Sequence, residues 1–187
     1  MTRISIVNAA HEFIAAHLTS GDLAIDATVG NGFDSQFLLN QVTLKGKVYG
    51  FDIQSEAIAA TQIRTHQPDN LRLFCACHSE MPRFIPASDH GLIKAVMFNL
   101  GYLPGGDRAT ITRSETTLAA LEQVLNVLLA PRGVVSIVVY PGHAGGSSEA
   151  DAVKTWCLAL PTQRYHVSCL SSDPTNPAAP SLLMIKA

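Results

Sequence analysis

The segment DATVGNGFDS, residues 26–35, combines two glycines with acidic, hydroxyl and amide side chains. Gly30 and Gly32 lack a Cβ, so a ligand could approach the backbone closely at these positions. The helix expected to follow would offer its free N–H groups at the same place. A tight turn, with Asp34 as a helix cap, is the alternative interpretation.

Acidic residues around this loop favour a cationic ligand that contains adenosine. Asp52 lies 20 residues after Gly32, at the end of the next apolar run, and its carboxylate could accept hydrogen bonds from both hydroxyls of a ribose. Asp26 and Asp34 would repel a pyrophosphate and attract a sulfonium or an ammonium. A dinucleotide site would also have a third Gly or Ala where Ser35 stands. We therefore predict S-adenosylmethionine as the ligand.

The segment NLGY, residues 99–102, follows the apolar run IKAVMF and precedes LPGG. The side-chain carbonyl of Asn99 and the backbone carbonyl of Leu100 could bind the N–H bonds of an amine if Gly101 bends the chain. Methyl transfer to nitrogen needs the lone pair in line with the S–CH₃ bond, and alignment of this kind lowers the barrier substantially. The ring of Tyr102 could stack on a base. A turn with a core tyrosine is the alternative.

The segment YPGHAGG, residues 140–146, would lie on the same rim, at the end of the next strand. Tyr140 is assigned to substrate binding. His143 could accept a proton, because an unperturbed imidazole titrates near neutral pH. Bulk water could also take the proton, so a binding or loop role for His143 is the alternative.

Several charged residues near this rim are candidates for contact with the substrate. Asp107 could face an amine or cap a turn. Arg108 and Arg113 could bind RNA phosphates or remain solvated. His78 follows the third expected strand and is assigned to the edge of the cofactor pocket.

Apolar runs alternate with segments of helical spacing along the chain, which predicts an α/β fold: a mostly parallel sheet with helices on both faces. We expect strands over residues 23–28, 47–53, 71–77, 93–98, 134–140, 165–170 and 181–186. Helices are expected over residues 8–18, 34–41, 55–66, 114–129 and 149–160, with a further one between the third and fourth strands. The short link between the last two strands predicts antiparallel pairing there.

The composition indicates a single domain over residues 1–187. The chain is 47% hydrophobic and 15% charged, which provides for a large core. The formal net charge of −2 excludes a strongly basic protein but not a local RNA-binding patch. No apolar run approaches the roughly 18 residues of a membrane span, and no signal peptide is recognisable, so we expect a cytoplasmic protein that does not associate with membranes.

The cysteines are interpreted as reduced core thiols; they are Cys75, Cys77, Cys157 and Cys169. The run Cys75-Ala76-Cys77-His78 invites a zinc interpretation. However, paired zinc ligands are usually separated by about two to four residues, and no second ligand pair follows. We predict no metal.

Four separated segments, in this order, resemble one known family: DATVGNGFDS, GFDIQSEAI, FNLGYLPGGD and VVYPGHAGG. The similarity extends to the ending YHV…TNPAAPSLLMI. The family is the YtqB or MnmM family of small methyltransferases, which are labelled rRNA methylases. The segment NLGY is also similar to the Asn-Pro-Pro-Tyr motif of amino-methyltransferases, with Leu100-Gly101 in place of both prolines.

The resemblance implies a three-layer, Rossmann-like class I methyltransferase fold with a mostly parallel seven-stranded sheet and an antiparallel C-terminal strand. It implies S-adenosylmethionine as cofactor and methylation of 5-aminomethyl-2-thiouridine at the tRNA wobble position. It also implies the tRNA anticodon stem-loop as a partner, and a homodimer.

The residue chemistry and the resemblance together assign three groups of site residues. The catalytic group is Asn99, Leu100, Tyr102 and His143. The cofactor-binding group is Asp26, Thr28, Gly30, Asn31, Gly32, Asp34, Asp52, Ile53, Gln54 and His78. The substrate-binding group is Gly101, Asp107, Arg108, Arg113 and Tyr140.

Three alternatives stay open at this point. The first keeps the enzyme class but has an rRNA base as methyl acceptor. The second is a nicotinamide-dependent oxidoreductase, against which Ser35 argues. The third is a nucleotide-binding module without catalysis, which would leave NLGYLPGG unexplained.

Overall fold

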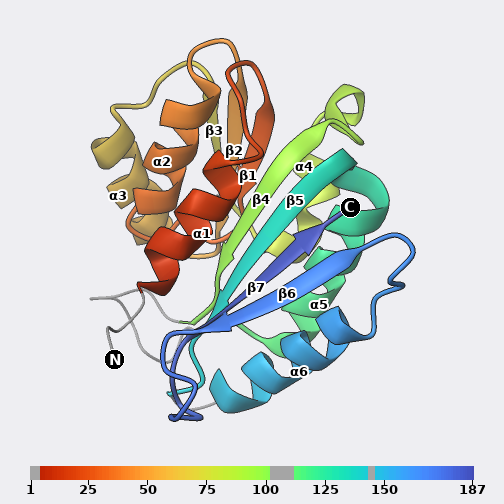
Figure 1. Cartoon of the computed structure of the whole chain (residues 1–187). Helices are drawn as coiled ribbons and strands as arrows, with labels where there is room; N and C mark the ends of the chain where they lie inside the picture. Colours follow the sequence, from red (N-terminus) through yellow and green to blue (C-terminus); the bar gives the residue numbers. More distant parts are fainter. Residues whose placement is uncertain (1–4, 102–111, 143–145) are drawn as a thin grey trace.

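The computed structural model describes residues 5–101, 112–142 and 146–187. A seven-stranded sheet forms the middle layer, with helices on both faces (Figure 1). Its strands are β1 (Leu23–Asp26), β2 (Lys47–Asp52), β3 (Leu71–Cys75), β4 (Ile93–Asn99), β5 (Leu129–Val139), β6 (His166–Ser171) and β7 (Ser181–Lys186). The α-helices are α1 (Ile6–Ala15), α2 (Phe33–Val42), α3 (Ser55–Thr65), α4 (Met81–Phe84), α5 (Ser114–Gln123) and α6 (Gly146–Leu158). Two 3-10 turns, η1 (His78–Glu80) and η2 (Ala87–Asp89), and a π-helical turn, η3 (Val124–Leu128), complete the described elements.

The strand order is β3-β2-β1-β4-β5-β7-β6. The strands β1 to β5 pair in parallel, whereas β7 pairs antiparallel with both β5 and β6. The predicted α/β class and the antiparallel final pair are thus confirmed. Because neighbouring parallel strands end at the same edge, the segments that follow β1, β2 and β4 converge there.

Each face of the sheet has its own apolar core. The helices α1, α2 and α3 cover one face and α4, α5 and α6 the other (Figure 1). Alternate residues of a strand point to opposite faces, so Ala24 packs in the first core and its neighbour Ile25 in the second. The same alternation divides Val134 and Val135 of β5. A central strand buried on both faces therefore has an apolar residue at almost every position.

The structure corrects two predicted boundaries around residue 130. The helix predicted over 114–129 ends as an α-helix at Gln123 and continues as the π-helical turn η3. The strand predicted from Val134 begins at Leu129, with a register shift opposite β4. Pro131 has no N–H to give to a ladder, and Arg132 has a φ of +60°. These two residues explain the irregular start of β5.

Other boundaries differ by a few residues. The first helix begins at Ile6 because Ser5 caps it, accepting a hydrogen bond from Asn8 N. The first and third strands end at Asp26 and Cys75, earlier than predicted. The residues after these strands belong to the segments that build the candidate site.

The cysteines are free, as predicted, but two of them are not core residues. Cys157 is buried and Cys77 is half-buried, whereas Cys75 and Cys169 are exposed. The reason is the strand order: Cys75 lies on β3 and Cys169 on β6, which are the two edge strands of the sheet. In the described ranges, no helix combines the length and the apolar character that crossing a bilayer requires.

Candidate active site

The loop after β1 is organised by the buried carboxylate of Asp26. Its Oδ2 accepts a 2.6 Å hydrogen bond from the hydroxyl of Ser35, and its Oδ1 accepts one of 3.2 Å from Thr28 N. Burial, and next the charge of Asp34, raise the pKa of Asp26 to about 7. The side chain has no exposed surface, so it holds the loop by contact and acts on a ligand only through its field.

The two glycines adopt backbone conformations that favour glycine. The φ angles are +50° at Gly30 and +80° at Gly32. A Cβ on Gly32 would lie 2.9 Å from the Cα of Thr61 in α3. The hydroxyl of Thr61 donates a 3.2 Å hydrogen bond to the carbonyl of Gly30. The loop is therefore held closely against α3, and Gly32 cannot carry a side chain without movement.

Asp52 connects this loop to the end of β2. Its Oδ2 accepts a 3.1 Å hydrogen bond from Gly30 N, and its Oδ1 accepts one of 3.0 Å from Gln54 N. Burial raises the pKa of Asp52, and these N–H groups oppose the shift. Each carboxylate oxygen has a second lone pair available to a hydroxyl. The adjacent Ile53 is 53% exposed and offers an apolar face for a base. The carboxylate of Asp52 and this apolar face together fit the ribose and the base of an adenosine.

Asp34, in the first turn of α2, pairs with a residue that the sequence reasoning missed. The Nε2 of His11 lies 2.6 Å from Asp34 Oδ1, and the His11 ring stacks on Phe37 with centroids 3.9 Å apart. A histidine on an amphipathic helix gives no functional signal by itself, and α1 is distant from α2 in sequence. The pair places an imidazole ring beside the candidate site.

Asn99 ends β4 next to the glycine loop. Its backbone N–H donates a 2.7 Å hydrogen bond to the Thr28 hydroxyl. Burial first, and then the charge of Asp34, raise the pKa of the Tyr140 hydroxyl, and a side-chain hydrogen bond with Asn99 opposes the shift. The lowering is the direction expected when the amide N–H donates to the phenolic oxygen. With the amide oriented in this way, its carbonyl would be the group that faces a substrate.

The predicted bend at Gly101 is present. Gly101 has a φ of +147°. Its N–H donates to the Thr112 hydroxyl and its carbonyl accepts from Thr112 N, both at 3.0 Å. Leu100 is almost fully buried, and its N–H donates to Val138 O at 2.9 Å. The backbone of the NLGY segment is therefore fixed up to residue 101.

His78 lies beneath the glycine loop. It is 7% exposed, its ring meets Phe98 edge-on with centroids 5.7 Å apart, and a hydrogen bond ties it to the Ala27 backbone. Burial lowers the pKa of His78 to about 4, so the ring is neutral at physiological pH. Its contacts in this structure support the loop.

The remaining predicted site residues divide between described and undescribed segments. Arg113 is exposed and occupies the N-cap position of α5, without a hydrogen bond from its side chain to the helix. Tyr102, Asp107, Arg108 and His143 lie outside the described residues. The structure thus brings the predicted residues of β1, β2, β4 and β5 to one edge of the sheet, and the role of each stays a prediction. In the described ranges, no group of three or more His, Cys, Asp or Glu residues could hold a metal ion.

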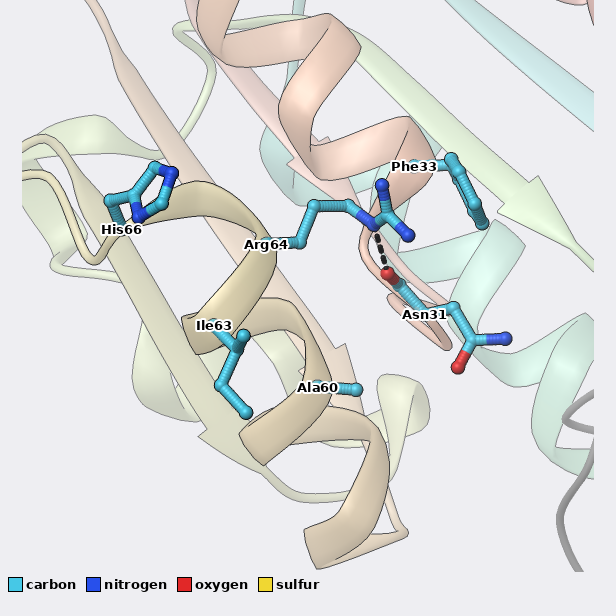
Figure 2. A pocket seen from close by; sticks show the side chains of 6 residues that line it. All are labelled: Asn31, Phe33, Ala60, Ile63, Arg64 and His66. Atoms are coloured by element: carbon cyan, nitrogen blue, oxygen red, sulfur yellow. Dashed lines mark hydrogen bonds between the residues drawn. The ribbon is translucent and has the colours of Figure 1, made fainter.

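An open hollow of about 590 Å³ lies between the glycine loop and α3 (Figure 2). Its lining residues are Asn31, Phe33, Ala60, Ile63, Arg64 and His66. The Arg64 guanidinium stacks 3.6 Å from the centre of the Phe33 ring, and its Nε donates a 2.6 Å hydrogen bond to Asn31 O. Asn31 is the one predicted cofactor-binding residue that lines the hollow, whereas Asp52 and Asn99 do not line it.

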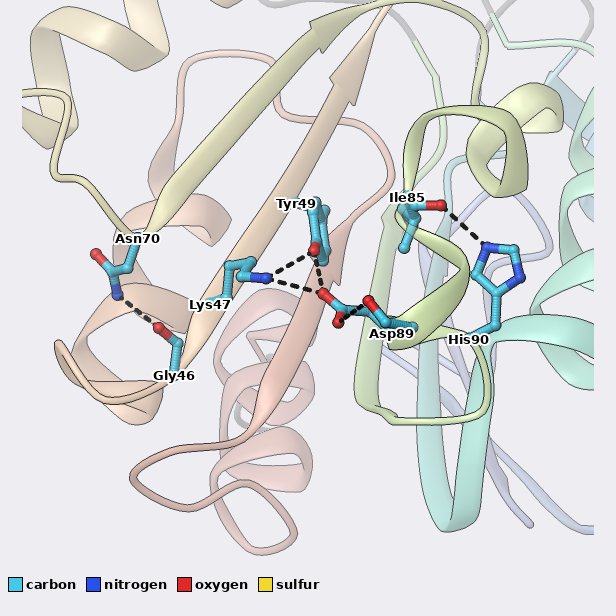
Figure 3. Close-up of polar contacts among 8 residues, drawn as sticks. Gly46, Lys47, Tyr49, Asn70, Ile85, Asp89 and His90 are labelled. Carbon is cyan, nitrogen blue, oxygen red and sulfur yellow. Dashed lines mark hydrogen bonds and ion pairs between the residues drawn. The ribbon is translucent and has the colours of Figure 1, made fainter.

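A second polar cluster lies at the start of β2, away from the edge that carries the site (Figure 3). The Lys47 ammonium donates to Asp89 Oδ2 at 2.9 Å and to the Tyr49 hydroxyl at 3.1 Å, and Tyr49 also donates to Asp89. The pKa of Asp89 is lowered by these bonds, the one from Lys47 first. The cluster ties η2 to the sheet and has a structural role.

Comparisons with known proteins agree with this geometry. Residues 48–186 match the model of the family described as "Putative rRNA methylase". A chloroplastic tRNA (mnm(5)s(2)U34)-methyltransferase from Arabidopsis thaliana is 37% identical over 179 residues, which are 90% of this chain and 64% of the relative. The chain thus spans somewhat less than two thirds of that relative's length.

Two solved structures superpose over the whole chain. A putative rRNA methylase from Clostridium thermocellum is 34% identical with a TM-score of 0.91, covering 100% of this chain and 99% of the other. A putative methyltransferase from Streptococcus mutans, in complex with SAH, is 32% identical with a TM-score of 0.86 and the same coverage. The class I methyltransferase fold and the prediction of S-adenosylmethionine are therefore confirmed, and the nicotinamide alternative is not supported. The chain belongs to the rRNA methylase family of S-adenosylmethionine-dependent RNA methyltransferases.

Proposed function

We propose that this protein methylates the aminomethyl nitrogen of 5-aminomethyl-2-thiouridine at the tRNA wobble position, giving 5-methylaminomethyl-2-thiouridine. The name of the Arabidopsis thaliana relative supports this substrate. The observation that carries the proposal is the 2.7 Å bond from Asn99 N to the Thr28 hydroxyl. It fixes an amide side chain beside the cofactor loop, where an amine acceptor would have to lie.

S-adenosylmethionine supplies an electrophilic methyl group on a sulfonium. In the proposed mechanism, Asn99 Oδ1 and the Leu100 carbonyl accept the N–H bonds of the neutral amine and direct its lone pair outward. Tyr140 orients the Asn99 amide through their hydrogen bond. Asp52 binds the ribose hydroxyls, and the Asp26 and Asp34 carboxylates attract the cationic part of the cofactor.

Substrate binding follows the same assignment. Tyr102 stacks on the base, and Arg113 and Arg108 bind phosphates of the anticodon stem-loop. The proton released from the methylated nitrogen passes to water or to His143. We also propose the homodimer that the resemblance implies, to be tested by light scattering, and the cytoplasm as compartment.

The test uses two tRNAs that differ only at the wobble position, one with 5-aminomethyl-2-thiouridine and one with 2-thiouridine. Each is incubated with the protein and S-adenosylmethionine, and the nucleosides are separated by mass spectrometry. We expect 5-methylaminomethyl-2-thiouridine from the first tRNA and no methylation of the second. A parallel incubation contains ribosomal RNA, and methylation found there but not in the tRNA would overturn the proposal in favour of the rRNA alternative.

A further inference from the structure

The clamp between Gly101 and Thr112 continues into a buried carboxylate on α6. Glu149 is 5% exposed. Its Oε2 accepts a 2.5 Å hydrogen bond from the Thr112 hydroxyl, and its Oε1 accepts one of 2.8 Å from the Thr117 hydroxyl. No ion pair to Glu149 is formed by the residues that the structure describes. Among the described residues, two hydroxyls donate to this buried carboxylate, and both donations have a fixed direction.

The direction of the hydrogen bond from Thr112 to Glu149 also determines how Thr112 binds Gly101. The Thr112 hydroxyl donates its proton to Glu149 Oε2. Its oxygen is then left as an acceptor, and it receives the N–H of Gly101 at 3.0 Å. Without the Glu149 acceptor, the hydroxyl hydrogen would be free to rotate toward the Gly101 N–H and oppose the bond. The Glu149 carboxyl on α6 thus sets the direction of the hydrogen bond that holds Gly101.

The peptide bond between Leu100 and Gly101 transmits this constraint to the substrate. A trans peptide is planar, and its C=O and N–H point in opposite directions. Fixing the Gly101 N–H on Thr112 therefore aims the Leu100 carbonyl away from Thr112. That carbonyl is one of the two acceptors assigned above to the amine.

We propose that Glu149 is a positioning residue, which acts through the Thr112 hydroxyl to aim the Leu100 carbonyl at the acceptor amine. This inference rests on the proposed function. It predicts that Glu149 and Thr112 affect the rate of methyl transfer and leave the binding of S-adenosylmethionine unchanged. Neither residue is among those assigned to the cofactor.

The two threonines provide a matched pair for the test. Thr112→Val and Thr117→Val each remove one hydroxyl from Glu149, but only Thr112 also binds Gly101. We expect Thr112→Val to lower kcat on the aminomethyl tRNA by about tenfold, the value of one hydrogen bond of ordinary strength. Thr117→Val should keep kcat within about threefold of wild type.

Three further measurements separate positioning from general damage. The Kd for S-adenosylhomocysteine should stay within about twofold in both valine variants, because a folded cofactor loop is retained. Thr112→Ser should restore kcat, since it keeps the hydroxyl. Glu149→Leu should resemble Thr112→Val, because it removes the acceptor that orients the Thr112 hydroxyl.

The inference is overturned if Thr112→Val and Thr117→Val have equal kcat, or if Thr112→Val loses only stability and cofactor affinity. Failure of the proposed function has a different signature, because the wild-type protein itself would then not methylate the aminomethyl tRNA.

Discussion

The backbone N–H of Asn99 donates a 2.7 Å hydrogen bond to the side-chain hydroxyl of Thr28. This bond joins the end of β4 to the loop after β1, and so joins the proposed amine site to the cofactor site. Methyl transfer requires the two reactants to be aligned within a few tenths of an ångström, and a bond between their supports contributes directly to that alignment.

Thr28→Val tests this connection. Valine has the shape of threonine without the hydroxyl, so the Asn99 N–H loses its partner and kcat should fall by about tenfold. Thr28→Ser retains the hydroxyl and should stay close to wild type. Steady-state methylation of the aminomethyl tRNA measures both, and equal rates for the two variants would show that the bond is not needed.

Asn99→Ala should lower the rate of methyl transfer by about a hundredfold or more and leave cofactor affinity within a few fold. The reason is that the amide carbonyl orients the acceptor and does not hold the donor. Asn99→Asp should recover activity as pH rises, because its charge stabilises the protonated, unreactive amine. Single-turnover kinetics together with calorimetry separate the two effects. A wild-type rate for Asn99→Ala would make NLGY only a turn.

Asp52→Ala should weaken S-adenosylmethionine binding by about tenfold to a hundredfold, since hydrogen bonds to charged groups contribute about 1.5–3 kcal/mol. The matched control is Glu56→Ala, which removes an exposed acid from the neighbouring first turn of α3. Calorimetry should find nearly wild-type affinity for that control. Unchanged affinity in Asp52→Ala would remove Asp52 from the ribose site.

The affinity for S-adenosylmethionine should rise with pH through the titration of Asp26. Burial and the charge of Asp34 raise the pKa of this carboxyl to about 7. Below that pH it is mostly neutral, and above it the ionised form attracts a sulfonium. Asp26→Asn should show a flatter profile in calorimetry between about pH 6 and 8. Identical profiles for the two proteins would exclude Asp26 as the titrating group.

His78 should make the fold sensitive to acid. Burial lowers its pKa to about 4, whereas the unfolded chain titrates at about 6.5. Between these values the unfolded state binds more protons, so the free energy of unfolding falls as pH falls, by up to ~3 kcal/mol. Urea unfolding at the two ends of this range should show a smaller loss in His78→Gln. Asp26, whose pKa is raised, makes the free energy of unfolding change with pH in the opposite direction. This contribution is the same in the wild-type protein and in His78→Gln.

The sequence predicted the elements and the converging loops because apolar alternation and glycine placement are local signals. It placed Asp52 and Asn99 at strand ends, where the structure has them, but it expected the first strand to continue past Asp26, and the strand order came from the structure. It did not reveal the contact between His11 and Asp34, since nothing in either segment specifies which helices will pack together.

The bonds from Thr112 and Thr117 to Glu149 were missed for a similar reason. They join residues 37 and 32 positions apart. Threonine and glutamate are also common residues on protein surfaces, so neither residue type signals this contact. Only burial distinguishes them, and burial of a polar residue is decided by tertiary packing. The early start of β5 was missed because Pro131 and Arg132 interrupt the apolar run that marks a strand.

The position of β7 between β5 and β6 has a consequence for the order in which the chain is made. The ribosome releases β6 before β7, yet among the described strands β6 pairs with β7 alone. Until residues 181–186 emerge, the backbone of β6 has either no strand partner or the edge of β5, which pairs with β7 in the folded protein. Completion of the sheet therefore waits for β7, and until then the nascent protein carries an open β-edge, a site for chaperone contact or mispairing.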